Sequence, residues 1–201
     1  GLAVWAKNHP DCTYYAPSRT AHALRYQYPQ LHGKLFDFEP GDSFSCGNFA
    51  VRTHRTPHDT PESVSYCFAS DAMRVMIATD LGHVTDALQE EMQDVDLLLI
   101  EANYDEMKLQ YGRYPQMLKR RIAGKNGHLS NVDCAASVLQ AVQNGAKRIL
   151  LGHLSEENNT PRLAYETVHR TLVDNGIIPG VDMQLQVAPR GMRGEPIMLE
   201  Q

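Results

Sequence analysis

Short apolar stretches alternate with polar, turn-forming stretches along the whole chain, and this pattern predicts a mixed α/β fold. The apolar run at 95–100 is typical of a strand buried on both faces. The amphipathic stretch 130–144 predicts a helix, which Ser130 or Asn131 can begin and Gly145 can end. Further strands are expected at 13–15, 34–38, 49–54, 63–69, 74–78, 148–151 and 184–188, and further helices at 18–26, 84–92, 115–123 and 160–175.

Turn signals organise the first half of the chain. Residues 40–42, Pro-Gly-Asp, separate two short β segments. Residues 70–72 can close a tight hairpin between the strands 63–69 and 74–78. Ser18 can cap the helix that begins there. Antiparallel strands therefore come first and strand–helix units later, which is typical of helices layered on sheets.

Composition indicates an ordinary globular protein. The 201 residues are 42% hydrophobic and 21% charged, which suits one domain over 1–201 with a real core. No apolar run is long enough to span a membrane, and no signal peptide is visible. The four cysteines form no Cys-x-x-Cys pair, so they are read as reduced thiols of a cytoplasmic protein.

The charged residues give two opposing indications about nucleic-acid binding. The net charge of −5 argues against bulk electrostatic capture of a polyanion. One basic cluster could nevertheless follow a phosphate backbone, although a solvated helix face explains it equally well. Its members are Lys119, Arg120, Arg121 and Lys125, with Lys108, Arg113 and Tyr114 upstream.

Three polar residues stand directly after expected strands or between them. His58 lies in a loop between two β segments, Asp80 follows the strand 74–78, and His153 follows the strand 148–151. Loops at strand ends commonly carry catalytic groups. Two imidazoles and a carboxylate are a suitable ligand set for Zn²⁺ or a related divalent ion.

Each of these residues also has a plainer interpretation. A histidine in a loop is more often a surface or capping residue, and Asp80 could cap the following helix. His128 stands just before an expected helix N-terminus, where backbone N–H groups favour an anion such as a phosphate. The plainer interpretation is that His128 only belongs to the segment that caps this helix. Dinucleotide, P-loop and nucleophile-elbow motifs are absent from the sequence.

Longer strings around these residues resemble a known family. The order Pro57-His58-Asp59, Thr79-Asp80-Leu81-Gly82 and Gly152-His153-Leu154-Ser155 is similar to the later metal motifs of the metallo-β-lactamase superfamily. The strings at 100–105, 127–131 and 153–159 resemble its YycJ/WalJ-type branch more closely. This resemblance runs over nearly the whole chain.

The resemblance implies an α/β fold, a four-layer αββα sandwich, with two divalent metal ions, zinc, manganese or iron, at one edge. His58 would bind one metal, Asp80 would bridge both, and His153 would bind the second. His128 would contact the scissile phosphate or stabilise the leaving group, with Asp59 and Ser155 as candidates to orient the histidine rings. The implied function is a metal-dependent phosphodiesterase or 5′-to-3′ exonuclease acting on DNA in repair.

The sequence departs from the family in one respect. The family's first metal motif, His-x-His-x-Asp-His, is absent, and residues 1–7 resemble the helix that follows it. We therefore expect an N-terminally truncated domain, its C-terminal two-thirds, that binds metal weakly by itself. The alternatives are a hydrolase of a small ester, thioester or lactam, and an inactive fragment that needs its missing part. The expected partner is DNA or a small phosphodiester. No association with a membrane is expected, and a homo-oligomer is possible.

Overall fold

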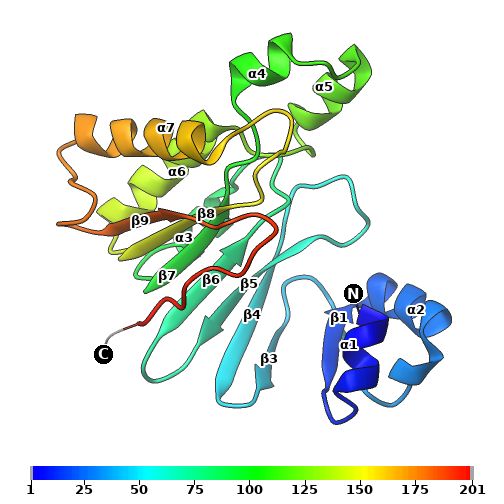
Figure 1. The fold of residues 1–201 in the computed structure, drawn as a ribbon. Helices are drawn as coiled ribbons and strands as arrows, with labels where there is room; N and C mark the ends of the chain where they lie inside the picture. Colours follow the sequence, from blue (N-terminus) through cyan, green and yellow to red (C-terminus); the bar gives the residue numbers. More distant parts are fainter. Residues whose placement is uncertain (1, 200–201) are drawn as a thin grey trace.

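The computed structural model describes residues 2–199, and seven strands form its main sheet in the order β3-β4-β5-β6-β7-β8-β9 (Figure 1). The strands β3 to β6 pair antiparallel, whereas β6 to β9 pair parallel. Strands in hairpins therefore come first and strand–helix units later, as the pattern predicts. The strands are β3 (Ser43–Cys46), β4 (Phe49–Arg55), β5 (Val64–Ala69), β6 (Arg74–Ala78), β7 (Leu97–Glu101), β8 (Arg148–Gly152) and β9 (Gln184–Val187).

A second, two-stranded sheet pairs β1 (Tyr14–Pro17) with β2 (Leu35–Phe38) in parallel. Because side chains alternate along a strand, one face turns Ala16 and Leu35 toward helices, while the other face turns aromatic rings toward the main sheet. The ring of Phe38 lies 5.1 Å from that of Phe44 in β3. The helices are α1 (Leu2–Asn8), α2 (Ser18–Gln27) and the 3₁₀ turn η1 (Pro29–Leu31).

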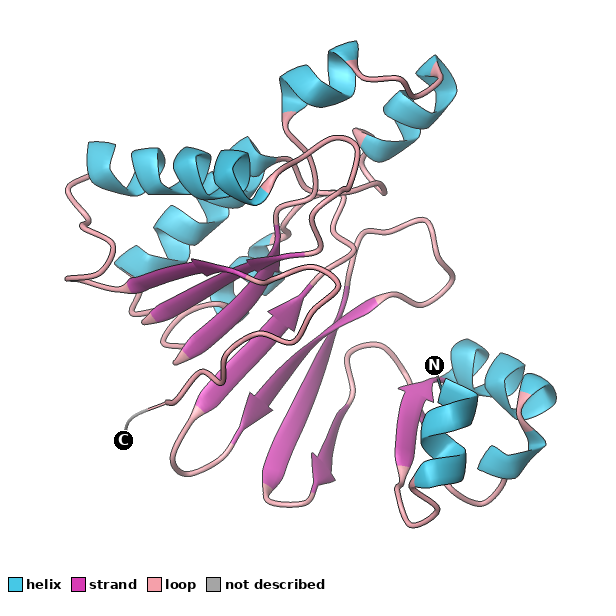
Figure 2. Cartoon of the chain, in the orientation of Figure 1, coloured by secondary structure: helices cyan, strands magenta, loops and turns pink. Residues whose placement is uncertain are grey.

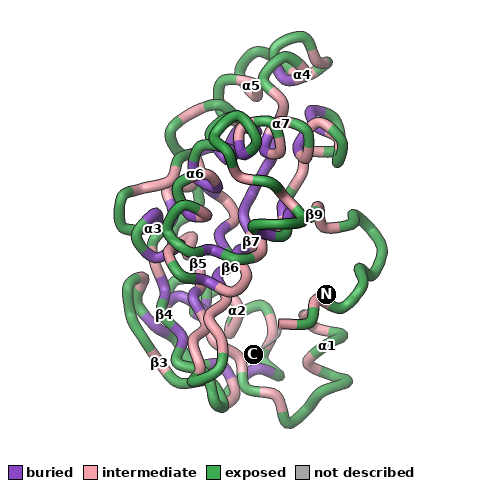
Figure 3. The backbone as a smooth tube through the Cα atoms, turned by 90° about the vertical axis from the view of Figure 1, so that its left-hand side faces the viewer, coloured by how far each residue is buried: buried purple, intermediate pink, exposed green. Residues whose placement is uncertain are grey.

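Further helices cover the face of the main sheet that is turned away from the two-stranded sheet (Figure 2). The predicted four-layer αββα order is therefore confirmed. Met76, Leu98, Ile100 and Leu151 point from the parallel strands into this core, and none of them is exposed to solvent. In Figure 3 buried residues gather along these strands. The other helices are α3 (Asp86–Glu91), α4 (Glu106–Tyr111), α5 (Gln116–Ile122), α6 (Asn131–Gln143) and α7 (Pro161–Asp174).

Most predicted elements are present, and the differences have local causes. The strand 74–78 has the predicted bounds, and Ser130 caps α6 by accepting a hydrogen bond from the backbone of Asp133. The cap predicted at Ser18 is wrong, because this residue already lies in the helix and its hydroxyl donates to Phe38. The expected strand 95–100 is buried on one face and only half-buried on the other. The elements β3 and α4 were not predicted.

Strand direction brings four loop starts to one edge of the main sheet. The strands β6, β7 and β8 are parallel, so their carboxyl ends meet at the same edge. The strand β4 also ends there, because two successive antiparallel pairings make it parallel to β6. All the candidate residues that follow these strands must therefore gather at this edge.

Candidate active site

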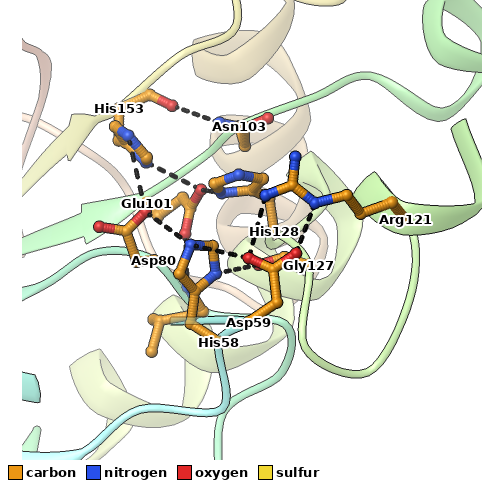
Figure 4. A network of polar contacts seen from close by, with 10 residues as sticks. His58, Asp59, Asp80, Glu101, Asn103, Arg121, Gly127, His128 and His153 are labelled. Atoms are coloured by element: carbon orange, nitrogen blue, oxygen red, sulfur yellow. Dashed lines mark hydrogen bonds and ion pairs between the residues drawn. The ribbon is translucent and has the colours of Figure 1, made fainter. Parts of the chain in front are cut away.

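The side chains of His58, Asp80, Glu101, His128 and His153 converge at the carboxyl edge of the main sheet (Figure 4). The loops after β4, β6 and β8 supply His58, Asp80 and His153, and the last position of β7 supplies Glu101. His128 comes from the loop before α6. Five groups from five separate segments meet here because the sheet topology aligns the strand ends.

The two residues Asp80 and His153 hold backbone conformations that side chains rarely adopt. Their φ angles are 57° and 55°, in the left-handed region. Such strain persists only where neighbouring groups hold it, and it is concentrated at functional sites. Here the amide after Asp80, that of Leu81, donates to Glu101 at 2.7 Å, and the Asn103 side chain donates to the carbonyl of His153 at 2.8 Å.

Glu101 is the centre of the site. Its side chain is fully buried, and its Oε1 accepts hydrogen bonds from Nδ1 of His128 at 2.6 Å and Nδ1 of His153 at 2.9 Å. Burial by itself would raise the pKa of the Glu101 carboxyl, but the hydrogen bonds from the two imidazoles outweigh burial and lower it. The bond to Glu101 in turn raises the pKa of His153, against the opposing effect of its burial.

Contacts at Nδ1 fix the orientation of all three imidazole rings. Nδ1 of His58 lies 2.8 Å from the carbonyl of Gly127, and a carbonyl can only accept, so this nitrogen carries the proton. Each of the three rings thus uses Nδ1 inside the protein and has Nε2 left to offer. Histidines that bind a metal usually donate their second N–H to a carboxylate or carbonyl in this way.

The remaining distances make the cluster suitable for divalent cations. Oδ1 of Asp80 lies 3.4 Å from Nε2 of His58 and 3.9 Å from Nε2 of His153, between the two. Ligand atoms fall into two compact groups that could each hold an ion. One consists of His58, Asp80 and His128, and the other of Glu101, His128 and His153. His128 belongs to both groups, so geometry offers it as a ligand as well as a phosphate contact.

The residues proposed to orient the rings differ from each other. Asp59 lies beside the cluster, with Oδ1 at 3.6 Å from Nε2 of His58, and Arg121 holds it through two contacts at 2.5 and 3.0 Å. The hydrogen bond from Arg121 lowers the pKa of Asp59. Ser155, in contrast, uses its hydroxyl to accept a hydrogen bond from the backbone of Asn158 in its own loop.

Buried asparagines connect the three loops behind the site. Asn131 and Asn159 exchange side-chain hydrogen bonds at 3.1 and 2.8 Å, and Asn159 also donates to the carbonyl of Ala102 at 2.8 Å. Both asparagines are almost fully buried. The three family-like strings therefore meet in space, and their asparagines fix the relative positions of the segments that carry Glu101, His128 and His153.

The backbone of residues 122–127 packs tightly against the loop after Asp80. A Cβ placed on Gly82 would come within 2.1 Å of the carbonyl oxygen of Lys125, so only glycine fits there. Nδ1 of His83 lies 3.1 Å from the same carbonyl. Because Gly127 also holds His58, this segment supports two of the candidate ligands at once.

A cavity of about 870 Å³ opens beside the cluster. His128 and His153 line it on one side, and Tyr114, Leu118 and Ile122 line it from the segment between α4 and α6. This volume is within the range of about 300–1,000 Å³ that is usual for small-molecule sites. A substrate placed in the cavity would therefore reach the free nitrogens of the site.

Sequence reasoning singled out His58, Asp80, His128 and His153, and the structure brings these four together. Glu101 lies in one of the family-like strings, at 100–105, but no role was predicted for it. The signal was present, because Glu101 directly follows an apolar run, and Asp80 and His153 each come two positions after the end of one. The Asp59–Arg121 pair was missed as well, since its members lie 62 positions apart.

Comparisons with known proteins agree with this geometry. The chain is 31% identical over 177 residues to exodeoxyribonuclease YycJ of Bacillus anthracis, covering 88% of the chain and 67% of the relative. It is 36% identical over 188 residues to exodeoxyribonuclease WalJ of Streptococcus pneumoniae, covering 92% of the chain and 70% of the relative. The chain thus spans about two thirds of the length of these relatives.

Solved structures show the same fold at much lower identity. The metallo-β-lactamase fold protein YhfI from Bacillus subtilis superimposes with a TM-score of 0.62 at 16% identity, over 89% of this chain and 62% of YhfI. The family description "Beta-lactamase superfamily domain" matches residues 1–154. Together these relatives confirm the predicted fold and the predicted class, a metal-dependent hydrolase of the nuclease or phosphodiesterase type. The chain belongs to the metallo-β-lactamase superfamily, close to its YycJ and WalJ exodeoxyribonucleases.

Proposed function

We propose that this chain carries the substrate-facing part of a metal-dependent phosphodiesterase, a 5′-to-3′ exonuclease that acts on DNA. The observation that supports this most directly is the cluster at the carboxyl edge. There Asp80 lies between two imidazoles whose Nε2 atoms are unused, and Glu101 holds two rings in place. The YycJ and WalJ relatives are named exodeoxyribonucleases, and the proposal extends that substrate class to this chain.

In this proposal His58, Asp80 and His153 would hold two divalent ions. The donor set of imidazole nitrogen and carboxylate oxygen suits zinc, manganese and iron. When bound, such ions lower the pKa of a coordinated water to about 7 and offset negative charge on the phosphate. The family's first metal motif, absent from these 201 residues, would supply further ligands.

His128 is the residue proposed to contact the phosphate. Its ring is one-fifth exposed and lines the cavity, and Glu101 fixes its orientation through Nδ1. A protonated His128 beside Glu101 can donate from Nε2 to a phosphate oxygen or to the leaving oxygen.

Two further proposals concern the whole chain. We infer that 1–201 is one domain, because β9 lies beyond the family match at residue 154 and yet pairs with β8 in the main sheet. A cytoplasmic location fits four cysteines that are all free thiols. Among residues 2–199, no helix has the length and apolar character needed to cross a membrane.

A small-molecule hydrolase is the second candidate, and the cavity of about 870 Å³ beside the site favours it, because that volume suits a small substrate. Turnover assays would separate the two, using a protein in which the family's first metal motif precedes these residues. We expect Mn²⁺- or Zn²⁺-dependent release of nucleotides from 5′-phosphorylated single-stranded DNA, some hydrolysis of a bis-aryl phosphodiester, and no hydrolysis of a chromogenic lactam. Lactam or thioester turnover without phosphodiester turnover would refute the proposed function.

A further inference from the structure

A strongly basic arm stands beside the cavity. We define the arm as residues 106–125, which include α4 and α5 and lie apart from the main sheet in Figure 1. The arm contains six lysines or arginines and one glutamate, a net charge of +5, in a chain whose net charge is −5. Positive charge is therefore concentrated in one-tenth of the sequence, next to the candidate site.

Most of this charge is free to meet a ligand. Within residues 2–199, Arg121 is the arm cation that has a carboxylate partner, Asp59. Arg113, Arg120 and Lys125 are exposed and form no ion pair in the described part of the chain. A group of unpaired cations on a surface attracts a polyanion, and binding releases the polyanion's counterions.

The arm also contributes an aromatic and apolar wall to the cavity. Tyr114 is half-buried there, next to Leu118 and Ile122 of α5, and His128 and His153 line the same cavity. Cationic grooves that also present aromatic rings are typical of sites for single-stranded nucleic acid, because each base offers a flat π face for stacking. An acidic peptide would use the cations but not this wall.

We propose that the arm is the strand-binding element of this protein and that Tyr114 stacks on a base of single-stranded DNA inside the cavity. The choice of DNA rests on the proposed function. A phosphate placed at His128 would leave the adjoining base in the cavity, against Tyr114, while the next phosphates run along the exposed cations of the arm. A double strand does not fit this arrangement, because its bases are stacked on one another and not available to the tyrosine.

Binding of a fluorescent twelve-residue oligothymidine to the 201-residue chain tests this without any turnover. Fluorescence anisotropy in EDTA keeps metal out of the measurement. Tyr114→Ala should weaken binding about ten-fold or more, since base–aromatic stacking of about 1–3 kcal/mol is lost. Tyr111→Ala is the matched control, because Tyr111 lies on the same arm but is 73% exposed and outside the cavity lining.

The arm's charge is tested by salt dependence. The double variant Arg120→Gln with Lys125→Gln should flatten the slope of log K against log salt by about 1.4, or about 0.7 per lost phosphate contact. The control is Arg162→Gln with Arg170→Gln on α7, which removes the same charge from an exposed helix outside the arm. Melting curves by circular dichroism verify that all variants are folded.

Several results would overturn the inference. They are no binding of oligothymidine by the wild-type chain, an equal loss in the Tyr114 and Tyr111 variants, or displacement of the oligonucleotide by poly-glutamate as effectively as by unlabelled DNA. The proposed function fails on a different measurement, the absence of metal-dependent phosphodiester turnover. Binding without turnover and turnover without arm-dependent binding are thus distinguishable outcomes.

Discussion

Two buried glutamates, Glu91 and Glu101, contact the main sheet, and they differ in the groups that they bind. Glu91 ends α3 near the first residue of β6, and Glu101 lies beside the loop that follows β6. Glu91 is 7% exposed and Glu101 is fully buried. Glu91 contacts Arg74 at 2.5 Å, Arg52 at 3.3 Å and His54 at 3.1 Å, whereas Glu101 contacts two histidines and one backbone amide.

The difference lies in what each carboxylate leaves free. An arginine paired with Glu91 has no lone pair to offer, so that cluster connects α3 to the sheet and ends there. A histidine that donates its Nδ1–H to Glu101 still has Nε2 available on the side of the cavity. The shortest contact of Glu91 is thus with a guanidinium and connects α3 to the sheet, whereas Glu101 holds two imidazoles through Nδ1 and leaves their Nε2 atoms at the candidate site.

The largest expected effect is a loss of activity on substitution at the carboxyl edge of the main sheet, compared with substitution at the opposite edge. In a protein that also carries the family's first metal motif, Asp80→Ala should lower phosphodiester turnover about a thousand-fold or more, because the carboxylate between the two histidines is removed. Asp94→Ala is the matched control, since Asp94 also has a left-handed φ, 52°, but precedes β7 at the opposite end. Equal activity in the two variants would disprove the site.

The next effect compares the glutamates directly. Glu101→Gln should weaken Mn²⁺ or Zn²⁺ affinity about 10- to 100-fold, because the amide lacks the negative charge beside the two imidazoles and its NH2 group cannot accept from the backbone amide of Leu81. Glu91→Gln should leave that affinity unchanged, since Glu91 contacts none of the candidate ligands and its shortest contact is with Arg74, the first residue of β6. Isothermal titration with each metal gives both values, and a similar loss in both variants would show that the effect is one of general stability.

Unfolding should show the reverse preference. Glu91→Gln is expected to reduce the free energy of unfolding by about 1–3 kcal/mol, because Arg74 loses a charged hydrogen-bond partner at a mostly buried position. The neighbouring Glu90→Gln, at an exposed position of the same helix, should change it by less than about 0.5 kcal/mol. Urea denaturation of the metal-free chain measures both, and equal values would contradict a structural role for the Glu91 cluster.

The smallest effect is a pH dependence. Burial alone would raise the pKa of Glu91, but the hydrogen bond and charge of Arg74 outweigh burial and lower it below 4.5. A carboxyl with a lowered folded pKa stabilises the protein above its unfolded pKa and loses that contribution as pH falls through the folded value. The stability difference between wild type and Glu91→Gln should therefore be constant above about pH 5 and shrink toward pH 3. Urea midpoints across this range check it, and a difference that grows in acid would reverse the sign.

Sequence patterns predicted the elements whose limits depend on local signals. The strand 74–78 was bounded by a turn before it and a polar loop after it, so its limits were predicted without error. The strand β3 and the helix α4 were not predicted, because they are short and depend on tertiary partners such as the pairing of Phe44 with Val51. The pattern also could not show that β1 pairs with β2 in a sheet of their own.

The candidate site was predictable only where a residue's place along the chain implied its place in space. His58, Asp80 and His153 follow strands, and parallel strand ends converge, so their proximity could be expected. The role of Glu101 depends on partners 27 and 52 positions away, which no spacing rule connects. The roles of metal ligand and phosphate contact assigned to these residues stay predictions until the variants above are measured.

The close approach of Gly82 to Lys125 has a consequence for engineering. A designer who wished to exchange the arm for that of a relative would have to carry over the loop after Asp80 as well, because the two backbones touch and a single added methyl group would separate them. The arm and the loop after Asp80 must therefore be exchanged together. A library that varies the backbone of one segment must vary the backbone of the other.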